Sequence, residues 1–97
     1  MLDEANIKIT SLAQKPVRER LAETLLTLDK IFKPEPHSLT KHTVITLSRK
    51  DIANLVGTAT ETTIRILSEF KSDHLIGIKG RKITILDIKS LQKIAYL

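Results

Sequence analysis

The sequence predicts a small, mainly α-helical domain with a short β-hairpin, which is an α+β fold. Apolar residues recur at every third or fourth position through much of residues 17–70, as on the buried face of α-helices. Within residues 75–86, two short runs of alternating isoleucines flank a glycine, as in a β-hairpin. The length of 97 residues suits one domain with one modest core.

The first predicted helix starts near Pro16, which suits the first turn of a helix, and ends near Lys33. The prolines of "KPEP" stop it, because they remove donors and disfavour helix in the preceding residues. Its buried stripe should contain Val17, Leu21, Leu25, Leu28 and Phe32. The polar residues off this stripe are Arg18, Glu19, Glu23 and Asp29. A loop at residues 34–41 and a β-branched strand at residues 42–47 should follow.

A short helix is then expected over residues 49–56. Ser48 is its predicted N-cap, with the acidic Asp51 at the third helical position. Gly57 can adopt the left-handed conformation that ends many helices. The predicted buried residues of this helix are Ile52, Leu55 and Val56.

A second helix should begin at once, because Thr58 and Glu61 have the spacing of a capping box. Its buried stripe should contain Thr63, Ile66, Leu67 and Phe70. Its solvent side should carry Glu61, Arg65, Ser68 and Ser72, with Thr60, Thr62 and Ile64 on the flanks. Two helices joined by so tight a turn form a helix-turn-helix unit.

Two interpretations of Thr60 and Thr62 remain open. Threonine is a mediocre helix former, but it is small enough to enter a groove and can contact phosphates, base edges or a thymine methyl group. Alternatively, both threonines belong to an ordinary hydrated face. Thr58 is already explained as a cap.

The predicted hairpin turns at "KGRK", residues 79–82, where a glycine lies in a short connection. The alternating apolar residues of its strands are Ile76, Ile78, Ile83 and Ile85. A helix-turn-helix followed by a hairpin is a winged helix, and the basic tip of the wing is placed to contact phosphate. Alternatively, the basic residues only protect an exposed edge strand. A final short helix, capped by Asp87, should bury Leu91 and Ile94.

Positive charge is concentrated in the part of the chain that contains the helix-turn-helix and the wing. Residues 40–82 carry eight Lys and Arg against four Asp and Glu, whereas residues 1–39 are balanced at six of each. A localised basic surface is typical of a protein that binds a polyanion. A solvated surface with a few extra lysines is the alternative.

The sequence gives no support to an enzyme, a metal site or a membrane span. It has no cysteine, no run of about eighteen apolar residues, and only three glycines, which form no phosphate loop. No metal-ligand spacing relates the histidines His37, His42 and His74. Each of the acidic residues Asp51, Glu61 and Asp87 is expected at the start of a helix, so none of them needs a catalytic role to explain it. Three aromatic residues are too few for a platform that stacks single-stranded bases.

The segments "LSRKDIANLVGTATETTIRILSEFKSDHLI" and "GRKITILD" resemble the DNA-binding domain of the Crp/Fnr family of bacterial transcription regulators. The shared pattern is L-[ST]-R-x-[DE]-I-A, a glycine turn, x-x-E-T-x-x-R-x-L, L-I and a G-[RK]-x-I wing. The resemblance covers about residues 15–95. Departures at Thr60, Thr63 and Ile64 leave the DNA target sequence open.

The resemblance implies a winged helix-turn-helix that binds double-stranded DNA. A recognition helix at about residues 59–72 would enter the major groove, and a wing at about residues 79–82 would contact phosphate. The residues implied to contact bases are Thr60, Glu61, Ile64 and Arg65. The residues implied to contact the DNA backbone are Arg49, Thr58, Thr62, Ser68, Lys79, Arg81 and Lys82.

The resemblance also implies a domain organisation. Residues 1–14, with the apolar seam Leu2, Ala5, Ile9 and Leu12, look like the tail of a dimerisation helix, and residues 15–97 form the winged helix-turn-helix domain. No cofactor is expected in this chain, because it lacks the effector-binding sensor domain usual in the family. Expected partners are double-stranded DNA, a second copy in the parent protein and RNA polymerase, in the cytoplasm. The alternative is a protein-interaction or structural module without sequence-specific DNA binding.

Overall fold

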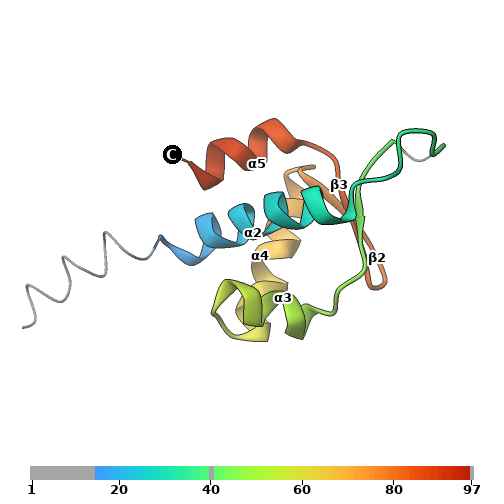
Figure 1. Ribbon diagram of the computed structural model, residues 1–97. Coiled ribbons are helices and arrows are strands. Elements are labelled where there is room, and N and C mark those ends of the chain that lie inside the picture. Colours follow the sequence, from blue (N-terminus) through green and yellow to red (C-terminus); the bar gives the residue numbers. More distant parts are fainter. Residues whose placement is uncertain (1–14, 40, 97) are drawn as a thin grey trace, which may run out of the picture.

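The computed structural model describes residues 15–39 and 41–96 of the chain (Figure 1). Its elements are α2 (Val17–Phe32), β1 (Val44–Ile45), α3 (Arg49–Val56), α4 (Thr60–Ser72), β2 (Ile76–Lys79), β3 (Lys82–Ile85) and α5 (Ile88–Ala95). The mainly helical α+β fold is therefore confirmed. The predicted dimerisation tail, residues 1–14, lies outside the described residues. No helix of the described ranges is long and apolar enough to cross a membrane.

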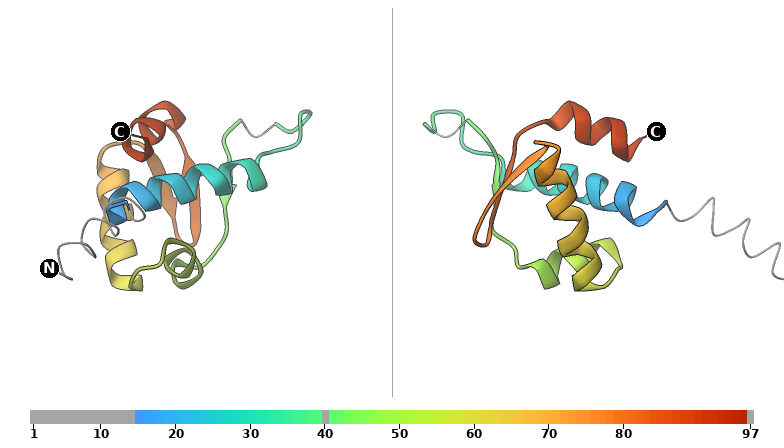
Figure 2. Two further views of the ribbon diagram at one scale, coloured as in Figure 1. Left: turned by 60° about the vertical axis from the view of Figure 1, so that its left-hand side comes forward. Right: turned by 180° about the vertical axis from the view of Figure 1, so that it is seen from behind.

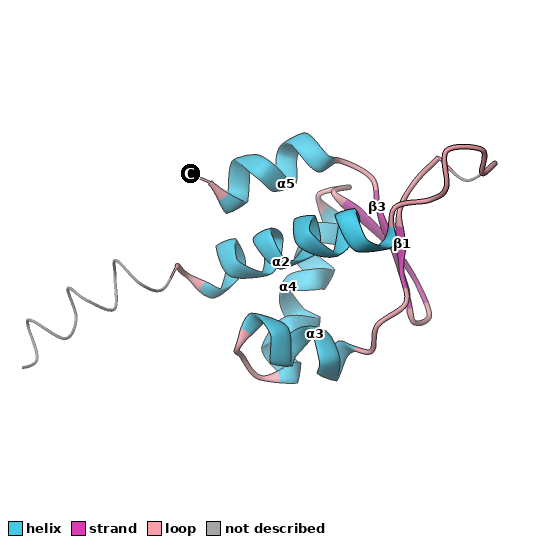
Figure 3. Cartoon of the chain, viewed as in Figure 1, coloured by secondary structure: helices cyan, strands magenta, loops and turns pink. Residues whose placement is uncertain are grey.

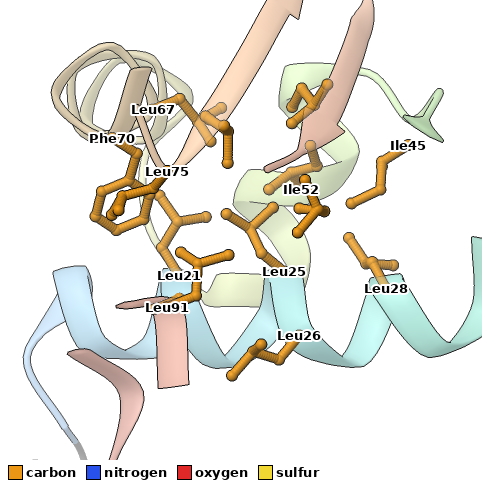
Figure 4. Packing of buried hydrophobic residues seen from close by; sticks show 14 of the residues in the cluster. Leu21, Leu25, Leu26, Leu28, Ile45, Ile52, Leu67, Phe70, Leu75 and Leu91 are labelled. Carbon is orange, nitrogen blue, oxygen red and sulfur yellow. The ribbon is translucent and has the colours of Figure 1, made fainter. Parts of the chain in front are cut away.

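Helix α2 lies at the centre of the domain, with α5 on one side and α3 and the start of α4 on the other (Figures 1 and 2). Figure 4 shows Leu21 and Leu25 of α2 pointing toward Phe70, Leu67 and Ile52, and these five side chains are almost completely buried. This part of the core lies between α2 and the helix-turn-helix and orients α4, and the same buried cluster continues to residues of the sheet and of α5.

The predicted stripe of α2 is confirmed, but the buried surface of this helix is wider than the stripe. Leu26 points away from Leu25 toward the other side of α2 (Figure 4), and Ala22 is also buried. Asp29 was expected off the buried stripe, yet it is only 8% exposed. The expectation for Asp29 is wrong because α2 is covered on two sides, so a single amphipathic stripe underestimates its burial.

The hairpin belongs to a three-stranded antiparallel sheet with the strand order β1-β3-β2 (Figure 3). Strands β2 and β3 form the predicted hairpin, with Ile76 opposite Ile85 and Ile78 opposite Ile83. The strand predicted at residues 42–47 is confirmed only at Val44–Ile45, which pairs with β3. It is short because Ser48, three residues later, already caps α3.

The predicted boundaries of α3 are confirmed. The side chain of Ser48 accepts a hydrogen bond from the Asp51 amide at 3.0 Å, and Gly57 ends the helix with a φ of 84°. The buried set differs from the expected one, because Leu55 is 59% exposed and Ala53 is buried. The helix meets the core through residues 52, 53 and 56, which places Leu55 on the outer side.

The predicted capping box at the start of α4 is wrong. The N-cap of α4 is Ala59, with no side-chain cap. The amide of Thr58 instead donates to the carbonyl oxygen of Ala53 at 3.1 Å, which closes the end of α3. Thr58 therefore belongs to the turn, and this shifts the helix start to Thr60 and removes Glu61 from the third helical position.

Candidate nucleic-acid interface

Helix α4 has one buried and one exposed face, as its sequence predicts. The buried stripe is Thr63, Ile66, Leu67 and Phe70. Of the predicted base-contacting residues, Glu61 and Arg65 are exposed and Ile64 is 46% exposed. Thr60 is half-buried as the first residue of the helix. Burial of the stripe against α2 thus turns a carboxylate, an aliphatic side chain and a guanidinium outward.

The ion pair of Arg65 differs from the one that its helical spacing suggested. Glu61 lies one turn before Arg65, so the sequence allowed a surface pair between them. In the structure, Arg65 Nη1 instead lies 3.0 Å from Oε2 of Glu69, one turn later. Arg65 is therefore directed toward the C-terminal half of α4.

The wing presents its positive charges at a tight turn. Gly80 has a φ of 61° at the first of the two turn residues, where a type II′ hairpin requires a positive φ. Lys79, Arg81 and Lys82 around it are all exposed. Figures 1 and 2 show this tip on the same side of α2 as α3 and the start of α4. The wing therefore presents three cations on the side of α2 where the helix-turn-helix lies.

Arg49, a predicted DNA-backbone contact, also joins the helix-turn-helix to the wing. Its Nη2 donates to the carbonyl oxygen of Gly80 at 3.0 Å, and its Nη1 donates to that of Arg81 at 3.4 Å. Arg49 is half-buried at the start of α3. The structure thus brings together two groups of predicted site residues that lie about thirty positions apart in the sequence.

The remaining predicted backbone contacts lie along the turn and α4. Thr58 and Thr62 are half-buried, and Ser68 is exposed. Neither threonine is deeply buried, so both interpretations of Thr62, phosphate contact and hydrated face, are compatible with its position. Asp51 and Glu61 are exposed as well, and the described residues contain no group of three or more acidic or histidine side chains that could hold a metal ion.

Three basic residues, in or just before the first turns of α2, connect this helix to the rest of the domain. Lys15 donates to the carbonyl oxygen of Ala95, the last residue of α5, at 2.7 Å. Arg18 contacts Glu69 of α4 at 2.8 Å. Arg20 donates to the carbonyl oxygen of Val56, at the end of α3, at 3.1 Å. In the sequence, these contacts could have been suggested only by the three basic residues that lie close together at positions 15, 18 and 20. Helical periodicity alone classes such residues as polar surface.

Comparisons with known proteins agree with this architecture. A family model described as a Crp-like helix-turn-helix domain matches residues 19–94. The fumarate and nitrate reduction regulatory protein of Vibrio cholerae is 34% identical over 87 residues, which are 90% of this chain and 34% of that protein. The transcriptional activator protein Anr of Pseudomonas protegens is 33% identical over 76 residues, which are 78% of this chain and 31% of that protein.

Among solved structures, a Crp/Fnr family transcriptional regulator of Thermus thermophilus has a TM-score of 0.74 and 30% sequence identity, covering 97% of this chain and 47% of that one. The chain spans about a third of the length of the two curated relatives. The resemblance to Crp/Fnr regulators that the sequence motifs carry is thus confirmed over nearly all the described residues. The chain belongs to the family of Crp-like helix-turn-helix domains.

Proposed function

We propose that this chain binds double-stranded DNA in a sequence-specific manner as the DNA-binding part of a transcription regulator. Helix α4 enters the major groove, and the wing contacts the phosphate backbone. The observation that carries this proposal is the outward face of α4, where Glu61, Ile64 and Arg65 are exposed. The basic tip of the wing lies on the same side of α2 as the start of this helix (Figures 1 and 2).

The side chains on this face match the chemistry of base edges in the major groove. The guanidinium of Arg65 can donate two hydrogen bonds to O6 and N7 of one guanine. The carboxylate of Glu61 can accept a hydrogen bond from the N4 amine of cytosine, and Ile64 can contact a thymine methyl group. Thr60, at the first position of α4, completes the base-contacting set.

Contacts to the backbone hold α4 in register without reading sequence. Lys79, Arg81 and Lys82 offer three cations at the wing tip, and neutralised phosphates release counterions. Arg49 keeps the tip beside the helix-turn-helix. Phosphate contacts from Thr58, Thr62 and Ser68 complete the backbone-contacting set.

The longer relatives suggest how the domain works in a whole regulator. Two copies bind two half-sites, with recognition helices about 34 Å apart along the duplex. The contact between the two copies is not made by the residues that the structure describes. The DNA-bound dimer has RNA polymerase as a partner. The regulator acts in the cytoplasm of a bacterial cell. The domain itself catalyses no reaction and needs no cofactor to bind DNA.

The test is a selection from random duplex DNA with the full 97-residue chain, followed by affinity measurements on the recovered site. We expect one preferred sequence and a steep fall of affinity with salt. Recovery of unrelated sequences that bind as weakly as random DNA would contradict the proposal.

An apolar hollow between α2 and α3 favours a second candidate, a winged-helix module that binds another protein. The hollow has a volume of about 250 Å³ and is lined by Thr24, Thr27, Leu28, Ile31 and Leu55. Ile31 and Leu55 are 69% and 59% exposed, which is unusual for large apolar side chains so close together. Under this alternative the selection recovers no preferred duplex.

A further inference from the structure

The carboxylate of Glu69 joins two arginines from different helices. Its Oε2 accepts a hydrogen bond from Arg65 Nη1 at 3.0 Å, and its Oε1 accepts one from Arg18 Nη1 at 2.8 Å. Arg18 lies in the first turn of α2, whereas Arg65 lies in the middle of α4. Each oxygen of Glu69 therefore has its own guanidinium partner.

Arg18 is itself held by two more groups. Its Nη2 lies 3.5 Å from Oδ2 of Asp73, and its Cζ lies 4.8 Å from the centre of the Phe70 ring. Phe70 is completely buried, so it gives Arg18 a rigid support. Because Arg18 is fixed in this way, it also fixes the carboxylate of Glu69 beside Arg65.

The pair directs Arg65 away from the part of α4 that contacts bases. Thr60, Glu61 and Ile64 lie in the first half of the helix, and N-terminal residues of a recognition helix usually contact base edges. Oε2 of Glu69 accepts a hydrogen bond from the guanidinium of Arg65, as O6 or N7 of a guanine could. Glu69 therefore presents the same kind of partner that Arg65 would find on DNA.

We infer that Glu69 is an internal competitor for Arg65, held in place by Arg18. Duplex DNA obtains the guanidinium of Arg65 only by displacing it from Glu69. The side chains of Arg65 and Glu69 are 64% and 43% exposed, so this exchange needs no unfolding. The inference rests on the proposed function and specifies how one contact of that interface is controlled.

The effect of Glu69 on affinity should depend on which base lies opposite Arg65 in the duplex. A duplex with guanine at the position of Arg65 has to break the pair, whereas other bases leave the pair intact. Removing the carboxylate should therefore tighten binding mainly to the guanine-containing site. For a half-exposed ion pair, the expected gain is about two- to fivefold.

The experiment measures duplex affinities of Glu69→Gln on the selected site and on its single-base variants. Asp73→Asn is the matched control, because it removes the same charge from the same end of α4 and contacts Arg18 but not Arg65. Glu69→Asp keeps the charge but shortens the side chain. Each substitution is also made in an Arg65→Ala background, and thermal melts verify that every variant is folded.

We expect Glu69→Gln to bind the preferred site about two- to fivefold more tightly than Asp73→Asn does, and Glu69→Asp to show part of this excess. The excess should vanish without Arg65 and on site variants that lack the guanine. An excess that survives in the Arg65→Ala background, or is equal on all duplexes, would show that Glu69 acts through charge alone and would overturn the inference.

Measurements on Arg65→Ala separate a failure of the competition by Glu69 from a failure of base recognition by α4. If Arg65→Ala relaxes discrimination at one base pair while Glu69→Gln behaves like Asp73→Asn, only the competition is disproved. If Arg65→Ala changes no base preference, base recognition by Arg65 fails, and the competition fails with it.

Discussion

Nη2 of Arg49 lies 3.0 Å from the carbonyl oxygen of Gly80, so the first residue of α3 holds the turn of the wing. The same guanidinium also reaches the carbonyl oxygen of Arg81 at 3.4 Å. A planar guanidinium can donate to two acceptors at once, which the ammonium of lysine does with less geometric control. Arg49 therefore orients the wing relative to the helix-turn-helix, in addition to any contact with phosphate.

Replacing Arg49 by Ala should weaken binding to every duplex by more than the loss of one phosphate contact. The wing would lose its connection to α3, so its basic tip would be less well placed. Lys50→Ala is the matched control, because Lys50 is the next residue of the same helix and is exposed. The affinities are measured by titration with labelled duplex. Equal losses of affinity in the two variants would show that Arg49 contributes only its positive charge and does not orient the wing.

Replacing Lys82 by Ala should weaken binding to all sequences about equally. Each lost phosphate contact reduces counterion release, so the slope of log affinity against log salt should flatten by about one unit. Lys89→Ala serves as the control, because Lys89 is an exposed residue of α5. Helix α5 lies on the opposite side of α2 from the wing tip (Figure 1). Identical salt slopes for both variants and the parent chain would argue against phosphate binding by the wing.

Replacing Gly57 by Ala should lower the stability of the domain by about 1–2 kcal/mol. Gly57 has a φ of 84°, and an added Cβ would meet no atom within 4 Å, so the cost comes from backbone conformation alone. Gly77→Ala is the control, because that glycine has no positive φ and its added Cβ would make only ordinary contacts at 3.8 Å. Chemical denaturation of both variants checks the difference.

The N-cap of α5 should make stability depend on pH in the acid range. The hydrogen bonds from the hydroxyl and the amide of Ser90 lower the pKa of Asp87 below its ordinary value of 3.8. The cap therefore contributes stability above that value, and this contribution is lost as the pH falls through the lowered pKa. Asp87→Asn should melt below the parent chain at neutral pH, and the gap should narrow in strong acid. A constant gap at all pH values would contradict a role for the charged cap.

Much of the fold follows from local sequence patterns. Ser48 and Asp87 have the side chains that accept hydrogen bonds from helix N-termini, and both do so in the structure. Gly57 ends α3 because it adopts the left-handed conformation at no steric cost. The glycine turn and the alternating isoleucines likewise predict the register of β2 and β3. These features depend on neighbouring residues, so one sequence is enough to find them.

The wrong predictions concern features that depend on tertiary packing. Whether Leu55 or Ala53 faces the core depends on how α3 lies against α2, which periodicity alone does not determine. Thr58 has the side chain of a cap, but its amide is used to close α3, so the next helix starts later. The contact between Glu69 and Arg18 likewise joins residues that are distant in the sequence, so local spacing does not reveal it.

The central claim is that the outward face of α4 reads base pairs. The most direct test measures the affinity of Arg65→Ala for all single-base variants of the selected site. We expect a loss of about 1–3 kcal/mol on the preferred site and relaxed discrimination at one base pair, with a nearly unchanged melting temperature. An unchanged profile, or losses of affinity that simply follow a lowered melting temperature, would contradict the claim.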